Sequence, residues 1–227
     1  MSLNRPAFPI GAAWLAAALG LSAGPAQAGP AEDVQLIAAA TLGDALAVQR
    51  LLRAGGSVAA RDAAGRTALL AATQGNHVAA ARMLMEAGAD VNTQDHQRDS
   101  PFLLAGARGY TEIVRLALAH QPDFGLTNRY GGTALIPACH YGHVETVRVL
   151  LATPIDVDHV NNLGWTALLE AVILGDGGPA HTEIVRMLIA KGAKLDLADR
   201  SGVTPLAHAR SRAQKAIVAL LERAGAR

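Results

Sequence analysis

Residues 65–92 read GRTALLAATQGNHVAAARMLMEAGADVN, and variants of this phrase recur along the chain. The hydroxyl residue near its start is found again at a nearly fixed interval, at Thr67, Ser100, Thr133, Thr166 and Thr204. The spacings are therefore 33, 33, 33 and 38 residues, and five inserted residues, 176–180, account for the longer one. A fixed period of this length is typical of proteins built from stacked structural repeats.

Each repeat predicts a turn followed by two helices. The turn begins with Asp or Asn and reaches Gly three residues later, as in Asp62 and Gly65, because these residue types favour tight turns. The Thr or Ser that follows is a typical helix cap. The second helix carries apolar residues at helical spacing, for example Ile113, Val114 and Leu116. One unit cannot bury both helices by itself, so neighbouring units must stack.

The composition supports short, closely packed helices. Hydrophobic residues make up 51% of the 227 residues, but aromatic residues only 4%. The formal net charge is +1 and no long basic run occurs, so we expect no nucleic-acid partner. Cys139 is the single cysteine, which excludes an internal disulfide.

Residues 1–28 predict a secretory signal peptide. An apolar run at 10–21 is too short for a stable membrane anchor, and Ala26-Gln27-Ala28 fits the small-x-small cleavage pattern. We expect cleavage after Ala28, a periplasmic location and no membrane span in the mature chain. The alternative is a short membrane anchor that is never cut.

The repeated phrase resembles the ankyrin repeat, whose usual form is D-x-x-G-x-T-P-L-H-x-A-A-x-x-G-H with an ending near G-A-D-V-N. The resemblance implies an all-α solenoid of about six helix–turn–helix units joined by β-turn or hairpin loops. This domain is expected to span 29–227, with units one to six at 31–61, 62–94, 95–127, 128–160, 161–198 and 199–227. The first and last units are atypical, as expected at the ends of a stack.

Three departures from the family pattern carry structural expectations. The histidine after T-P-L is replaced by apolar residues such as Leu70 and Ile136, so apolar packing must brace the loops. Arg98 replaces the turn glycine of unit three, which predicts a strained or differently shaped turn. Pro137 falls near the fourth position of its helix and predicts a distorted first turn there.

The resemblance also implies a protein partner on the concave face, which the turn tips and first helices line. The variable positions there are Arg66, His96, Gln97, Asp99, Arg108, Arg129, Tyr130, His140, Tyr141, Leu163 and Trp165, with Arg200 in the last unit. Tyr, Trp and Arg are the types that dominate binding energies, so this set is the candidate protein-binding site. The alternative is that the rings pack on neighbouring turns and only stiffen the stack.

Other chemistry has weaker support. His77, His143 and His181 recur at the start of second helices, where we expect a structural role, and ligands one repeat apart lie too far apart for a shared metal ion. Cys139 occupies a small-residue core position, which argues against a nucleophile. The insert at 176–180 has one carboxylate, too few for a calcium site, and is either a partner-contacting loop or a neutral one.

The sequence thus predicts a monomeric, non-catalytic protein-binding module of the bacterial periplasm, with no cofactor and no metal. It would act as a scaffold or protective partner of an envelope protein, for example in stress defence. The alternative is an immunity or inhibitor protein that blocks the active site of an exported enzyme or toxin.

Overall fold

The computed structural model describes residues 30–227, so the predicted signal peptide lies outside the described part of the chain. Within that part the chain forms twelve α-helices and no strand, which confirms the all-α expectation. The helices are α1 (Pro30–Leu42), α2 (Ala45–Arg53), α3 (Ala68–Gln74), α4 (Val78–Glu86), α5 (Pro101–Arg108), α6 (Thr111–Leu118), α7 (Leu135–His140), α8 (Val144–Leu151), α9 (Ala167–Ile173), α10 (Pro179–Ala190), α11 (Pro205–Ser211) and α12 (Lys215–Arg223).

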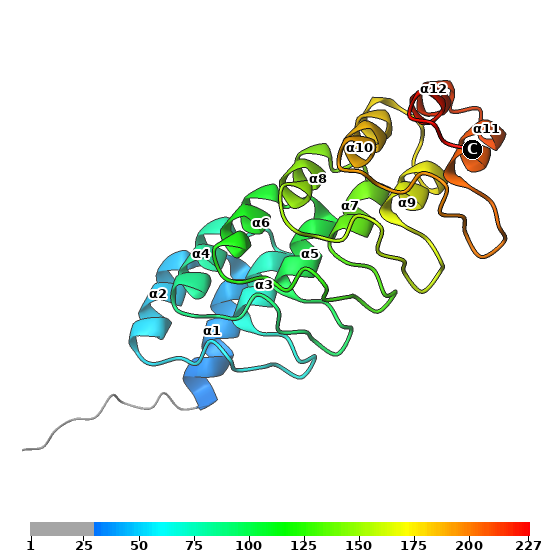
Figure 1. Cartoon of the computed structure of the whole chain (residues 1–227). Helices are drawn as coiled ribbons and strands as arrows, with labels where there is room; N and C mark the ends of the chain where they lie inside the picture. The colour runs from blue at the N-terminus through cyan, green and yellow to red at the C-terminus, as the bar shows by residue number, and fades with distance from the viewer. Residues whose placement is uncertain (1–29) are drawn as a thin grey trace, which may run out of the picture.

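The helices form two parallel rows in an elongated stack (Figure 1). Odd-numbered helices pack on one another from α1 to α11, and even-numbered helices do so from α2 to α12. The loops that lead into the odd-numbered helices project together on one side of the stack (Figure 1). Leu69, Leu135 and Leu168 are buried between the rows, as the repeated phrase requires. The exact bounds of the repeat units stay predictions.

Hydroxyl caps begin four of the first helices, as predicted. The side-chain oxygens of Thr67, Ser100, Thr166 and Thr204 accept from the backbone N–H three residues later at 3.2–3.3 Å. The prediction is wrong for Thr133, whose buried Oγ1 has no hydrogen-bond partner. Pro137 is the reason, because it has no N–H to give the Thr133 carbonyl, and α7 begins only at Leu135. The distorted first turn expected at Pro137 is thereby confirmed.

The turn of unit three is strained rather than reshaped. Arg98 has a φ of +62°, a left-handed value that L-residues other than Asn and Asp seldom adopt. Its N–H still donates to the Asp95 carbonyl at 3.0 Å, as the Gly65 N–H does to Asp62 at 2.9 Å in unit two. The repeat geometry therefore imposes the glycine conformation on an arginine.

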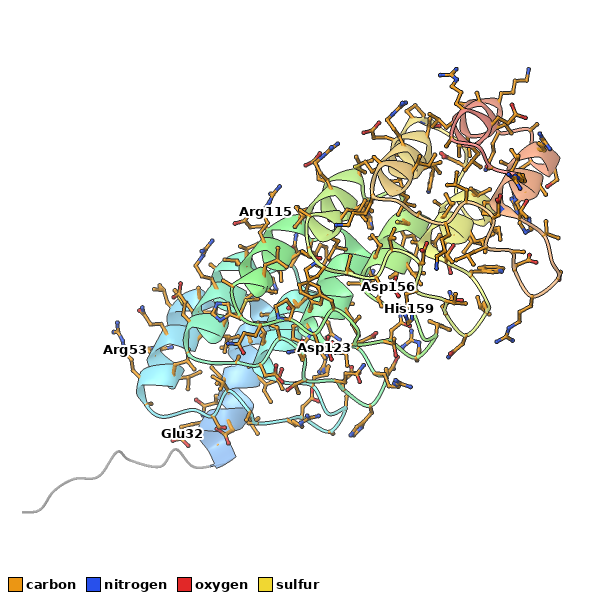
Figure 2. All side chains as sticks on the ribbon, viewed as in Figure 1. Glu32, Arg53, Arg115, Asp123, Asp156 and His159 are labelled. Carbon is orange, nitrogen blue, oxygen red and sulfur yellow. The ribbon has the colours of Figure 1, made fainter. Side chains whose placement is uncertain are left out.

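Hydrogen bonds and small residues hold neighbouring units together. His77 Nε2 donates to the Thr41 carbonyl at 3.1 Å, and His181 Nε2 to the His140 carbonyl at 2.8 Å, so the structural role predicted for these two histidines is confirmed. Within unit four His159, labelled in Figure 2, donates through Nε2 to the Gly131 carbonyl at 2.7 Å. Gly106 lets α5 approach α7, since a Cβ there would lie 2.8 Å from that of Ala134.

Candidate functional site

A groove of about 810 Å³ lies between the turns of units three to five and the helices α5, α7 and α9. Most of the predicted site residues line it. These are Asp99, Arg108, Arg129, Tyr130, His140, Tyr141 and Leu163. Residues almost 65 positions apart in the sequence thus meet on one surface, because the repeat places equivalent positions side by side.

The remaining predicted residues lie outside this groove. Arg66 is bound to Asp62 and to Gln74, and it lines a separate hollow beside α1. The His96 ring lies against Gly65, the stem of Arg200 lies against Gly164, and Gln97 accepts a hydrogen bond from Arg129. Trp165 is half-buried and does not line the groove. The predicted set is therefore several small surfaces, of which the middle one brings most of the predicted residues together in one groove.

The two tyrosines of the groove remain more than half exposed. Tyr130 is 58% exposed and Tyr141 60%. Tyr141 stacks on His140 with ring centroids 4.2 Å apart, and the Arg129 guanidinium lies 5.1 Å from the centroid of the Tyr130 ring. Each ring is thus supported by a neighbouring side chain and still open to solvent. Leu163 and Leu174, 49% and 42% exposed, add apolar surface to the same groove.

The groove also holds the buried carboxylate of Glu170, which was not predicted from the sequence. Glu170 is 5% exposed. Asn161 Nδ2 donates to its Oε1 at 2.9 Å, and the other oxygen, Oε2, lies 3.6 Å from His140 Nδ1. Burial raises the pKa of Glu170 to about 7, against a smaller lowering by the Asn161 hydrogen bond. The sequence feature that could have revealed Glu170 is its charge at the fourth position after the cap, where units two and three have the apolar residues Ala71 and Leu104.

Cys139 lies in the core, as predicted. It is fully buried, and burial followed by the nearby Glu170 carboxylate raises the pKa of its thiol. A neutral, inaccessible thiol is a poor nucleophile. Between residues 30 and 227 no cluster of His, Cys, Asp and Glu is arranged to hold a metal ion.

The insert at 176–180 extends a helix. Pro179 begins α10, which has 12 residues where α8 has 8. Asp176 Oδ1 accepts from the Gly178 N–H and from His181 Nδ1, both at 2.8 Å. The insert therefore orients His181 toward the preceding unit. Its role as a partner-contacting loop stays a prediction.

Stacked helix pairs with projecting loops define the protein as a helical repeat solenoid. The family model for ankyrin repeats (3 copies) matches residues 32–95, 102–196 and 153–227. The chain belongs to the ankyrin repeat family. Members of this family generally act in protein–protein interaction, and no helix in the described range is long and apolar enough to cross a membrane.

Solved structures and one curated protein are similar to this chain. An ankyrin repeat domain from Acinetobacter baumannii AYE is 53% identical with a TM-score of 0.82, covering 85% of this chain and 98% of that one. The ankyrin repeat protein EF0377 is 38% identical, also with a TM-score of 0.82, covering 84% and 98%. The ankyrin repeat domain of Bcl-3, an IkappaB family member, is 27% identical with a TM-score of 0.76, covering 85% and 86%. The putative ankyrin repeat protein YahD of Escherichia coli K12 is 46% identical over 57 residues, which are 25% of this chain and only 28% of YahD.

Proposed function

We propose that this chain is a non-catalytic binding module of the bacterial periplasm that holds a protein partner in the groove of units three to five. The observation that carries the proposal is the gathering of exposed Tyr130, Tyr141, Leu163 and Leu174 in one hollow. Exposed apolar side chains that cluster in a concave surface mark interaction sites more often than single ones do.

The composition of the groove supports a protein ligand. Aromatic residues are scarce in the chain, yet two tyrosines line the groove and stay more than half exposed. Tyrosine contributes large contact area and a hydroxyl at little cost in side-chain entropy, so it is frequent among residues that dominate binding energy. Asp99, Arg108 and Arg129 supply a charged rim.

The periplasmic location rests on residues 1–28 alone, through the apolar run and the Ala26-Gln27-Ala28 pattern. In that compartment the partner would be an envelope protein that the module scaffolds or protects. No contact in the groove favours the alternative of an inhibitor that plugs an enzyme.

The test is capture of the partner by the full chain with a C-terminal tag. The chain is expressed in its own cells, cross-linked, fractionated and purified, beside the variant Tyr130→Ala/Tyr141→Ala. The control is Leu42→Ala/Leu46→Ala, which trims two residues that are 79% and 76% exposed at the N-terminal end of the stack. All three proteins must first show the same helical circular dichroism and thermal midpoint.

We expect a protein that the parent and the control retain and the tyrosine variant loses, in the periplasmic fraction. Mass spectrometry of the purified chain should give an N-terminus at Gly29. A partner retained equally by all three proteins overturns the groove assignment. An intact N-terminus in a cytoplasmic fraction overturns the location.

A further inference from the structure

Glu170 lies at the groove with one of its carboxylate oxygens unused. Oε1 accepts from Asn161 Nδ2 at 2.9 Å. Among the described residues no hydrogen bond to Oε2 is formed, and His140 Nδ1 lies 3.6 Å away, beyond hydrogen-bonding distance. The Glu170 side chain is 95% buried, but Oε2 is not one of the buried side-chain atoms without a partner, so this oxygen keeps contact with the solvent in the groove. A ligand in the groove can therefore reach Oε2 and supply the missing donor.

The groups around Glu170 do not neutralise it. Burial, and then the charge of His181, lowers the pKa of His140, so its ring is uncharged at neutral pH. Cys139 on the same helix is a buried neutral thiol. Arg108 and Arg129, the cations of the groove, act on Asp99 in the turn of unit three, where both oppose the rise in pKa that burial causes. Above its pKa of about 7, where Glu170 is ionised, none of these groups offsets its negative charge, and an incoming cation can do so.

We infer that the groove receives a lysine side chain of the protein partner, with its ammonium group at Oε2 of Glu170. The inference rests on the proposed function, since it names the chemistry that the partner presents to the same groove. The four-carbon stem would lie along Leu163, Leu174 and Tyr141, which are exposed and apolar beside Glu170. Long cationic side chains bury their stems in this way while the charge meets a polar group.

The single free oxygen favours lysine over arginine. A guanidinium binds a carboxylate best through two parallel hydrogen bonds, one to each oxygen. At Glu170 this arrangement is disfavoured, because Asn161 already donates to Oε1 and a guanidinium would have to share that oxygen with it. An ammonium is a compact point charge that needs only one oxygen.

The first experiment titrates the full chain, processed as its cells process it, with blocked tripeptides at 150 mM salt and pH 8, where Glu170 is ionised. Gly-Lys-Gly is compared with Gly-Arg-Gly and with Gly-norleucine-Gly, which has the same stem and no charge. NMR follows the His140 ring and the Leu163 and Leu174 methyl groups. We expect millimolar binding of the lysine peptide and at least tenfold weaker binding of the norleucine peptide.

Variants separate the carboxylate from the fold. Glu170→Gln keeps an acceptor for Asn161, and Glu170→Ala introduces the residue that unit two has at this position. Both should weaken the lysine peptide at least tenfold, whereas Glu145→Gln, on an exposed carboxylate of α8, should not change it. Equal binding by the parent and both Glu170 variants, equal binding of the lysine and norleucine peptides, or no binding at all overturns the inference. Tighter binding of the arginine peptide overturns the choice of lysine.

The capture experiment distinguishes this inference from the proposed function. A partner that Tyr130→Ala/Tyr141→Ala loses and Glu170→Gln retains leaves the proposed function standing and overturns the lysine contact. A partner lost by both supports both. A partner retained by both overturns the groove itself.

Discussion

Units two and five are built on nearly the same phrase, RTALLAATQGN at 66–76 and WTALLEAVILG at 165–175. Both begin their first helix with a threonine cap and bury the same pair of leucines. They differ at the fourth position after the cap, where Ala71 in unit two corresponds to Glu170 in unit five. They also differ nine residues earlier, where Asp62 begins the turn of unit two and Asn161 that of unit five.

The two differences are coupled, because the first turn residue faces this helix position. In unit five Asn161 donates to Glu170 at 2.9 Å, and in unit six Asp199 Oδ2 accepts from His208 Nε2 at 2.8 Å. In unit two the helix residue is apolar, and Asp62 binds Arg66 instead. The stack therefore accepts a buried or partly buried polar side chain where the turn supplies the complementary donor or acceptor.

The substitution Asn161→Asp breaks this complementarity and should have the largest effect. Its Oδ1 would still accept the N–H groups of Leu163 and Trp165, as an aspartate does in unit two. The donor to Glu170 would be replaced by a second carboxylate. We expect a loss of about 3 kcal/mol in the free energy of unfolding at pH 8, measured with urea, and less at pH 5, where a proton can be shared.

Asn128→Asp is the matched control for this substitution. Asn128 holds the same turn in unit four, but the corresponding helix residue is Pro137, which has no carboxylate. We expect a change within about 0.5 kcal/mol. Equal losses in the two variants would show that the turn, and not its pairing with Glu170, sets the preference.

Glu170→Gln should remove a pH dependence of the free energy of unfolding that comes from Glu170 and has no counterpart in unit two. The pKa of Glu170 is raised from 4.5 to about 7 in the folded protein, so the folded state holds a proton that the unfolded state releases. The stability from this group is present below about pH 4.5 and is lost as the pH rises through about 7. The shift sets a ceiling of about 3 kcal/mol, and solvent in the groove reduces it to about 2 kcal/mol.

Urea unfolding of parent and variant between pH 4 and 8 measures this difference. The free energy of unfolding of the variant should rise relative to that of the parent as the pH rises, and it should be higher by about 2 kcal/mol at pH 8. Glu145→Gln, on an exposed carboxylate, should keep the slope of the parent. A Glu170→Gln variant that follows the parent at every pH contradicts the assignment of the shifted pKa.

Much of the fold could be predicted from the sequence, because each structural feature of the repeat occurs several times along the chain. The cap, the turn and the leucines occur at one spacing, so their roles follow from geometry that every unit shares. The exposed tyrosines of the groove were predictable for the same reason, as departures at positions that face outward. Glu170 was not, because its position is a core position in the other units, and its partner Asn161 lies nine residues away. Trp165 occupies an outward position, yet in the structure it is half-buried outside the groove.

Pro137→Ala would make the first helix of unit four more like that of unit two. The new N–H could donate to the Thr133 carbonyl, as Ala71 does to Thr67 at 3.0 Å, and Thr133 Oγ1 could then cap the helix. We expect a gain of about 1 kcal/mol, since the greater freedom of the unfolded chain offsets part of the new bonding. The thermal midpoint and the exchange protection of the residue 137 amide measure it. Pro205→Ala, at the first position of α11, has no bond to restore and should lose stability slightly.

Arg98→Gly should have the smallest effect, because it relieves strain at one exposed turn. The left-handed φ of +62° costs an arginine about 1 kcal/mol or more. Replacement by glycine removes this cost, but about half of the gain is cancelled because glycine raises the entropy of the unfolded chain. The exposed contact from Arg98 Nη2 to Thr127 at 3.3 Å would also be lost. We expect a net gain of about 0.5 kcal/mol in the free energy of unfolding, measured with urea.

Gly202→Ala is the reverse experiment, since that glycine has a φ of +77° and an added Cβ would meet no atom within 4 Å. It should cost about 1 kcal/mol through the backbone alone. If Gly202→Ala is costly and Arg98→Gly brings no gain, the contacts of the Arg98 side chain offset the strain in its backbone. The arginine side chain would then stabilise the turn of unit three.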